Sequence, residues 1–248
     1  MTPADRQPRP PLRIAVLASG RGSNLQAILD AIAAGVLDAT VVGVFSDKAR
    51  AAVLERARSA GLDAHALVPR DFPNRLEFDA AMFDAVEKSA PDLVVCAGYM
   101  RLISEPQVTR MAGRMVNIHP SLLPAFKGLH THQQALDANA TEHGASVHFV
   151  TPELDGGPVI AQARVAVDPT DDAERLALRV LEREHPLLLA TLDLLVAGRI
   201  TLATAPCGPR VEFDGVPLSA PLQLASGNVA PRLVGAATRH PPPPTDPC

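Results

Sequence analysis

Residues 117–124 read NIHPSLLP and place two chemically active side chains at the end of an apolar run. The amide of Asn117 donates hydrogen bonds, and the ring of His119 exchanges a proton near neutral pH. Donors of this kind stabilise an oxyanion, and an imidazole can act as a general acid. The pair therefore predicts an active site at a strand end, with ordinary turn residues as the alternative interpretation.

Asp155 is the third candidate, and it opens the sequence DGGP. An Asp-Gly pair is typical of tight turns, which is the plain structural interpretation. A turn that delivered this carboxylate to His119 would stabilise the imidazolium form and support acid catalysis. No G-x-S-x-G motif occurs, and no cysteine lies in a motif, so the residues favour proton transfer and oxyanion stabilisation over a covalent intermediate.

The stretch SGRGSN at residues 19–24 joins an expected strand to an expected helix. Its two glycines permit a tight turn and a close approach of the backbone to a ligand. The first amides of the helix, with Ser23 as an N-cap and Asn24 beside it, would then face an anion. Leu25 stands where a dinucleotide motif has its third glycine, so the loop predicts a site for one phosphate, with a simple βα turn as the alternative.

His119, His130 and His132 invite comparison with a zinc site, because three histidines can hold a catalytic zinc ion. Their spacing does not match H-E-x-x-H, and no acidic pattern supports such a site. We therefore expect no metal, and expect His130 and His132 to shape a loop that enters a helix, with Thr131 as its cap. His148 alternates with apolar residues on an expected strand and is interpreted as structural.

Alternating strands and helices must position these groups. Short apolar runs predict buried strands at 12–18, 40–46, 63–68, 92–98 and 114–118. Apolar residues at helical spacing predict helices at 23–35, 49–61 and 74–90. Because ligands in such sheets bind beyond the carboxyl ends of the strands, we expect the segments that follow the strands to share one crevice.

The pattern changes in the second half of the chain. Residues 145–150 and 158–167 flank TPELDGG, which predicts an antiparallel hairpin. A helical segment at 171–199 follows, and Pro186 should kink or split it. The expected fold class is α/β and Rossmann-like, with a mostly parallel sheet and an antiparallel hairpin extension.

Composition narrows the function classes. The chain has 248 residues, 47% of them hydrophobic, and a formal net charge of −4. No basic run with interleaved aromatic residues occurs, so we expect no nucleic-acid partner. The sequence has no apolar run of transmembrane length, no secretory signal and no CxxC pair, so we expect a cytoplasmic protein without a membrane partner.

The two ends of the chain are rich in residues that bury little apolar surface. We expect a disordered tail at 1–11, a catalytic domain at 12–205 and a Pro-rich, disordered tail at 206–248. Within the last segment, Asp214-Gly215 could still form a hairpin turn.

The chain resembles the glycinamide ribonucleotide formyltransferases, a folate-dependent family of purine biosynthesis, in the segments SGRGSNLQA, AGYMRLIS, NIHPSLLPAFKGLHTHQQAL and HGASVHFVTPELDGGPVIAQ. The resemblance runs from Arg13 to Gly198. NIHPSLLP alone indicates only the wider formyltransferase group, whereas SGRGSN and GLHTH indicate the narrower family. The resemblance implies the formyltransferase fold and transfer of a formyl group from 10-formyltetrahydrofolate to the amine of 5′-phosphoribosylglycinamide, without a metal.

The resemblance also implies roles for single residues. Asn117, His119 and Asp155 would be the catalytic residues of a direct transfer. The substrate phosphate would bind Gly22, Ser23 and Asn24, and Glu184 would contact the glycinamide substrate. The folate-binding residues would be Arg75, Met100, Arg101, Leu102, Ile103, Asn117, Val150, Thr151, Pro152, Glu153 and Leu154.

Other interpretations remain beside this one. A related formyltransferase or deformylase would use tRNA or water as the acceptor, although the short ends of this chain leave little room for the extra domains of those enzymes. A nucleotide-binding module without catalysis is the third interpretation. The chain departs from the family where Pro186 directly follows His185, at Ala125-Phe126-Lys127 and in the Pro-rich tail. We expect a monomer or a homodimer.

Overall fold

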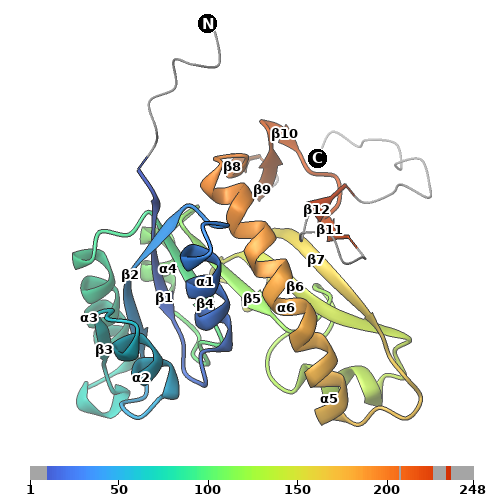
Figure 1. Ribbon diagram of the computed structural model, residues 1–248, viewed down its shortest axis with the longest axis horizontal. Helices are drawn as coiled ribbons and strands as arrows, with labels where there is room; N and C mark the ends of the chain where they lie inside the picture. Colours follow the sequence, from blue (N-terminus) through green and yellow to red (C-terminus); the bar gives the residue numbers. More distant parts are fainter. Residues whose placement is uncertain (1–9, 207, 226–232, 236–248) are drawn as a thin grey trace, which may run out of the picture.

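The computed structural model describes residues 10–206, 208–225 and 233–235 (Figure 1). Its helices are α1 (Ser23–Ala33), α2 (Ala52–Ser59), α3 (Arg75–Lys88), α4 (Glu105–Arg110), α5 (Thr131–Asp137) and α6 (Ala173–Val196), with a 3-10 turn at Pro69–Asp71. Its strands are β1 (Leu12–Leu17), β2 (Ala39–Ser46), β3 (Ala64–Ala66), β4 (Leu93–Ala97), β5 (Met115–His119), β6 (Glu142–Phe149), β7 (Val159–Ala166), β8 (Ile200–Ala205), β9 (Gly208–Phe213), β10 (Val216–Pro217), β11 (Leu222–Leu224) and β12 (Leu233–Val234).

A nine-stranded sheet forms the centre of the fold, in the order β12-β11-β7-β6-β5-β4-β1-β2-β3. The strands β3, β2, β1, β4 and β5 run parallel to one another, and β6 and β7 continue the sheet as an antiparallel hairpin beside β5. This confirms the expected α/β class and its antiparallel extension. The strand order reverses beside β1, between β2 and β4, and such a switch point is where ligands bind in open α/β sheets.

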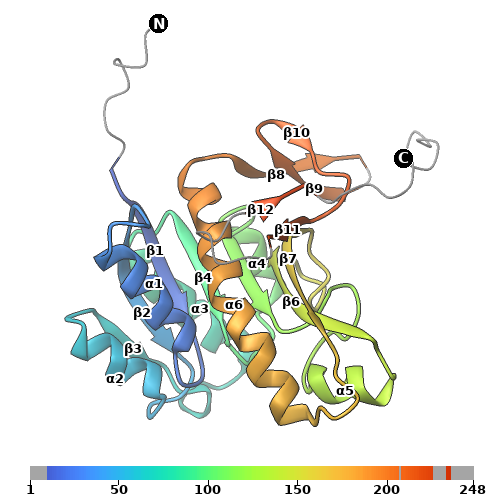
Figure 2. The same cartoon turned by 45° about the vertical axis from the view of Figure 1, so that its right-hand side comes forward.

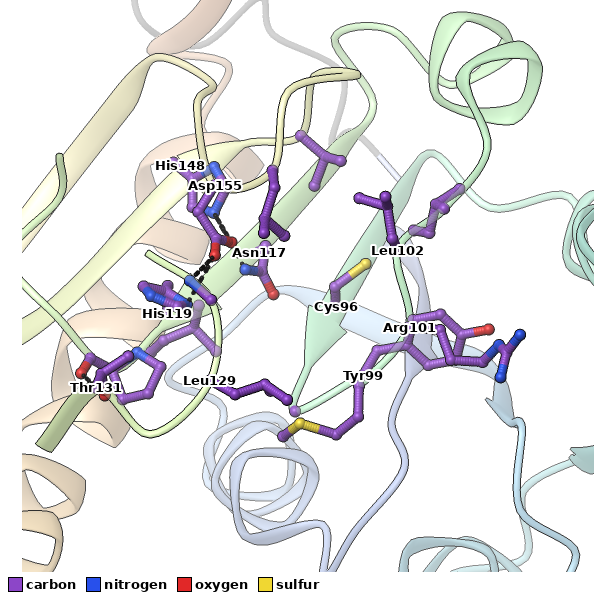
Figure 3. A pocket seen from close by; sticks show the side chains of 18 of the residues that line it. Cys96, Tyr99, Arg101, Leu102, Asn117, His119, Leu129, Thr131, His148 and Asp155 are labelled. Atoms are coloured by element: carbon purple, nitrogen blue, oxygen red, sulfur yellow. Dashed lines mark hydrogen bonds and ion pairs between the residues drawn. The ribbon is translucent and has the colours of Figure 1, made fainter. Parts of the chain in front are cut away.

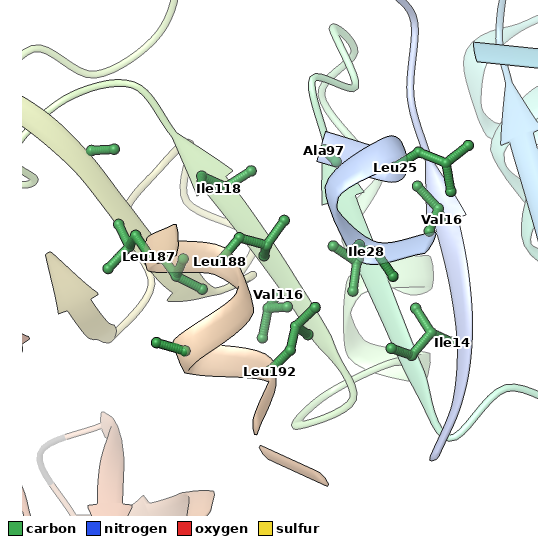
Figure 4. Close-up of a cluster of buried hydrophobic side chains, with 14 of the residues drawn as sticks. Ile14, Val16, Leu25, Ile28, Ala97, Val116, Ile118, Leu187, Leu188 and Leu192 are labelled. Carbon is green, nitrogen blue, oxygen red and sulfur yellow. The ribbon is translucent and has the colours of Figure 1, made fainter. Parts of the chain in front are cut away.

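Helices cover the two faces of the sheet unequally. One core packs α1, α2, α5 and α6 against the first face, and a smaller core packs α3 and α4 against the second. Alternation along β1 shows the division, because Ile14 and Val16 join the first core whereas Ala15 and Leu17 join the second. Figure 4 shows the first core, in which leucines of α6 pack between β5 and α1. No residue of β6 joins the second core, so that side of β6 is free to line a pocket.

Helix α6 is 24 residues long and contains Pro186. Pro186 was expected to kink or split the helix, and the split is wrong, because the helix continues on both sides of Pro186. Proline has no N–H and so leaves the Glu182 carbonyl without its intrahelical donor. Leu187 and Leu188 are fully buried against the sheet and stabilise the helix at that point. Neither α6 nor any other helix in the described part of the chain is long and apolar enough to cross a membrane.

The expected disorder after residue 206 is wrong for the residues that the structure describes there. The Asp214-Gly215 turn is confirmed, with φ of 51° and 77°, and it joins β9 to β10 in a second sheet with β8. Figures 1 and 2 both show this small sheet at the end of α6. Strand β11 pairs with β7, and its Leu222 and Leu224 are buried in the first core. The tail sequence RHPPPPTDPC and residues 1–9 lie outside the described residues.

Burial of β11 predicts a stabilising role for the C-terminal segment. Leu222→Ala should lower the free energy of unfolding by about 2–5 kcal/mol, because it removes buried methyl groups and leaves a cavity. Val216→Ala on the exposed β10 is the control, with an expected change within about 0.5 kcal/mol. Urea unfolding of both variants measures the difference. Equal effects would contradict the packing of β11 on the core.

Candidate active site

The register of β4, β5 and β6 places three polar side chains in a row. Cys96, Asn117 and His148 are direct cross-strand neighbours, and His119 pairs with Ser146 one step further along. They lie on the face opposite α6, because the alternate residues of β5 belong to the first core. Across the antiparallel β5–β6 pair, the Cβ atoms of direct neighbours are about 4.5–5.5 Å apart, so Asn117 and His148 form one continuous polar surface.

A cavity of about 610 Å³ opens against this row (Figure 3). Figure 3 shows Asn117, His119, His148 and Asp155 together on one side, with Leu102 and Arg101 across the cavity. Segments 98–103, 128–132 and 150–155 contribute most of the remaining lining. Cys96 lies at the base, where burial raises the pKa of its thiol to about 12. The thiol therefore stays protonated and is no nucleophile.

Asn117, His119 and Asp155 come together in this cavity. The Nδ1 atom of His119 is 3.6 Å from Oδ2 of Asp155, and Nε2 is 3.1 Å from the Phe126 carbonyl oxygen. Because a carbonyl oxygen only accepts, Nε2 carries a proton. Asp155 has a left-handed φ of 46°, and its Oδ2 accepts the Gly128 N–H at 2.9 Å. The turn therefore orients the carboxylate toward His119. Asp155 is thus both a turn residue and a partner of the imidazole.

Two buried polar side chains, which no sequence motif indicates, fix the loop that follows β5. Ser146 Oγ accepts the Leu123 N–H at 3.0 Å and donates to the Ser121 carbonyl at 2.7 Å. Gln162 Nε2 donates to the Leu123 carbonyl at 2.8 Å and to Ser146 Oγ at 3.0 Å. Buried polar groups that satisfy one another in this way specify a single loop geometry. Only the strand register reveals them, because no local motif marks either residue.

His148, which was interpreted as structural from the sequence, lies in the wall of the larger cavity. It lines the cavity, with Nε2 at 3.1 Å from Nδ2 of Asn117 and 3.8 Å from Oδ1 of Asp155. Burial lowers the pKa of its ring to about 4. Alternation along the strand showed correctly that His148 faces away from Val147, but it could not show that this face is a cavity.

His130 and His132 lie where the loop enters α5, the first as its N-cap residue and the second in its first turn. His132 lines the cavity, and its Nδ1 is 3.2 Å from Nε2 of the buried His143. The prediction that Thr131 caps α5 is wrong, because His130 is the N-cap residue and Thr131 Oγ1 donates to the Pro120 carbonyl at 2.7 Å. Within residues 10–206, 208–225 and 233–235, no three or more His, Cys, Asp or Glu side chains gather as ligands of a metal ion.

A second cavity, of about 270 Å³, lies between the glycine loop and α6. Helix α1 starts at Ser23 with Gly22 as the N-cap residue, so the expected Ser23 cap is wrong. No side chain caps the helix, and its first N–H groups remain available to an anion. Gly22 has φ of 77°, and a Cβ there would lie 2.7 Å from Cγ2 of Val53, so this position requires glycine.

Asn24 and Glu184 meet in the second cavity. The Nδ2 atom of Asn24 donates to Oε2 of Glu184 at 3.2 Å. Burial raises the pKa of Glu184, and the hydrogen bond from Asn24 opposes the shift. The Oδ1 atom of Asn24 is buried without a partner among the described residues, so an N–H or O–H of a ligand could satisfy it.

Gly98 and Met100 line both cavities, so the two meet beside the end of β4. Arg75 and Pro152 do not line the first cavity. The Nε atom of Arg75 instead lies 3.8 Å from Oδ2 of Asp79. The expected folate-binding residues that do line it are Met100, Arg101, Leu102, Ile103, Asn117, Val150, Thr151, Glu153 and Leu154.

Comparison with known proteins gives consistent matches. Residues 12–192 match the formyl transferase family. Phosphoribosylglycinamide formyltransferase of Escherichia coli (strain K12) is 48% identical over 191 residues, which cover 77% of this chain and 90% of that protein. The structure of phosphoribosylglycinamide formyltransferase from Coxiella burnetii superimposes with a TM-score of 0.79 at 43% identity, covering 84% of this chain and 96% of that one. A formyltetrahydrofolate deformylase from Burkholderia mallei reaches 0.71 at 28% identity, covering 82% and 70%.

The buried histidines predict a loss of stability in acid. Burial lowers the pKa of both His143 and His148 from 6.5 to about 4. Between those values the unfolded chain binds more protons than the folded chain, so the free energy of unfolding should fall as the pH falls. Above the ordinary pKa of 6.5 neither ring contributes to this dependence.

Urea unfolding at about pH 7, 6 and 5 measures this effect. We expect the free energy of unfolding to change less with pH in His143→Phe, because this variant has no imidazole to protonate at that position. His65→Gln, at an exposed histidine, is the control and should keep the wild-type slope. A wild-type stability that does not change over this range would contradict the buried, neutral state of the two rings.

Proposed function

The chain belongs to the formyl transferase family, and on this premise we propose how its residues carry out the reaction. It is an enzyme of purine biosynthesis that transfers a formyl group to the amine of 5′-phosphoribosylglycinamide. We propose 10-formyltetrahydrofolate as the donor and a direct transfer between the two bound substrates. The observation that carries this proposal is the junction of the two cavities at Gly98 and Met100, with Asn117, His119 and Asp155 lining the larger one.

The smaller cavity suits the acceptor substrate. The uncapped start of α1 at Gly22, Ser23 and Asn24 offers N–H groups and a helix dipole to one phosphate. Glu184 and the unpartnered Oδ1 of Asn24 can accept hydrogen bonds from the sugar or glycinamide part of the substrate. A phosphate at one end would direct the amine toward the junction with the larger cavity.

The larger cavity suits a folate. Its volume of about 610 Å³ is in the range of small-molecule sites, and its rim carries exposed apolar side chains at Met100, Leu102, Leu129 and Leu154. Arg101 Nε is buried without a partner in the described part of the chain and can donate to a folate atom. We propose no direct folate contact for Arg75, which lies outside this lining.

Chemistry follows from Asn117, His119 and Asp155 in the larger cavity. The amine attacks the formyl carbon, and negative charge develops on the formyl oxygen. An N–H of Asn117 and the protonated ring of His119 stabilise that charge. Asp155 orients the ring and stabilises its charged form. A proton then moves from the amine to N10 of the departing folate. Because both substrates are held together, orientation supplies much of the rate.

The related acceptors, tRNA and water, are less well supported. The sequence identity to the two phosphoribosylglycinamide formyltransferases is 48% and 43%, whereas the identity to the deformylase is 28%. The uncapped N-terminus of α1 and the hydrogen-bonded pair of Asn24 and Glu184 also suit a small phosphorylated acceptor better than water. We propose residues 12–205 as the catalytic domain, with β9 and β11 adding to its packing. The cytoplasmic location and the oligomeric state stay predictions.

An acceptor assay tests the proposed function. Purified chain with 10-formyltetrahydrofolate should formylate 5′-phosphoribosylglycinamide and give no comparable turnover with initiator methionyl-tRNA or water. His119→Ala should lower kcat by about 100-fold or more with little change in KM, because it removes the proton donor. Faster turnover of tRNA or water, or none with 5′-phosphoribosylglycinamide, would overturn the assignment.

Neutralising Asp155 tests the carboxylate–imidazole pair. Asp155→Asn keeps an oxygen that can accept the Gly128 N–H but loses the charge, so kcat should fall by about 100-fold or more and its pH dependence should change. Glu142→Gln, outside both cavities, removes an exposed carboxylate whose ion pair with Arg164 is worth little. Its kcat should stay within about 3-fold of wild type. Similar losses in the two variants would count against a specific role for Asp155.

A further inference from the structure

His148 is a buried histidine that the proposed mechanism does not use. It is 2% exposed, and it lies beside Asn117 across the β5–β6 pair. Its Nε2 is 3.1 Å from Nδ2 of Asn117, and its Nδ1 is 3.0 Å from the Phe149 carbonyl oxygen. Both ring nitrogens therefore have defined partners.

These partners determine where the ring proton is. The Phe149 carbonyl only accepts hydrogen bonds, so Nδ1 must carry the proton. Burial keeps the ring neutral, with a pKa lowered to about 4. The carboxylate of Asp155 opposes that shift, and His119 and Lys127 add to it; these are the ionisable groups that act on the ring. A neutral ring protonated at Nδ1 leaves Nε2 as an acceptor.

An acceptor at Nε2 fixes the Asn117 amide. With the amide reversed, its oxygen would face the lone pair of Nε2, and the two acceptors would repel. The amide nitrogen must therefore face His148, and its second N–H is free to point into the cavity. We propose that His148 is a positioning residue that, through its Nδ1–H tautomer, orients the Asn117 amide to donate to the formyl oxygen. This inference rests on the proposed function.

A purely structural role for His148 predicts different behaviour. In that case, its replacement would reduce activity to the same degree whether or not Asn117 is present. His143 is the matched control, because it lies on the same strand and is equally buried, but its Nε2 contacts His132 and not Asn117. The comparison separates the loss of a buried histidine from the loss of the contact with Asn117.

A double-mutant cycle on kcat makes the comparison. His148→Phe should lower kcat by about 10-fold or more with each KM within about 2-fold, as expected for a group that acts only in the transition state. In the Asn117→Ala background the same substitution should cause no further loss. His143→Phe should have the same proportional effect in both backgrounds. His148→Gln, which retains an acceptor and guards against misfolding of the Phe variant, should recover part of kcat.

The tautomer gives a readout that needs no activity. Long-range ¹H–¹⁵N spectra of the labelled wild-type chain at about pH 7 should show His148 neutral and protonated at Nδ1. An Nε2–H or doubly protonated ring would overturn the proposal, as would a full additional loss of kcat from His148→Phe in the Asn117→Ala background. A wild-type chain without formyl transfer would overturn the proposed function, whereas the Nδ1–H tautomer would still support the orientation of Asn117.

Discussion

The pairing of β5 with β4 and β6 is the constraint on which the site depends. Its register makes Cys96, Asn117 and His148 direct neighbours and sets His119 beside Ser146. A slip of one residue would turn Asn117 and His119 into the apolar core beneath α6 and bring Val116 or Ile118 into the cavity. The apolar face of β5 therefore specifies the position of the polar face. The same register of β5 therefore packs its apolar residues into the core and places its polar residues in the cavity.

A second constraint brings the substrates together. The strand order reverses beside β1, so the glycine loop after β1 and the segment after β4 enclose the same space. Gly22 permits the close approach of α1 to α2, and Met100 lies between the two cavities. The Met100 N–H is bonded at 3.0 Å to Ser19 Oγ, which ties the two loops to each other. A bimolecular transfer benefits most from this fixed geometry, because the two substrates lose their translational and rotational freedom on binding, before the reaction begins.

Much of this arrangement could be predicted from the sequence, since strands, the hairpin and the positions after strand ends follow from local patterns. The errors share a physical cause, which is that tertiary contacts decided the outcome. Ser23 and Thr131 have cap chemistry, yet the residues before them took the cap position. Pro186 stays inside a helix because buried leucines hold it there, and β11 forms because β7 offers an open edge. Ser146, Gln162 and His148 carry no local motif. Only the register shows that the first two reach the loop after β5 and that His148 reaches the cavity.

The central claim is that one crevice orients both substrates so that the amine meets the formyl group between Asn117 and His119. A crystal structure of the chain with 5′-phosphoribosylglycinamide and an unreactive folate analogue tests it most directly. We expect the phosphate at Gly22–Asn24, the folate in the larger cavity, and the amine close to the formyl position, beside Asn117 Nδ2 and the His119 ring. A phosphate bound elsewhere, or a folate whose formyl position lies away from these two side chains, would contradict it.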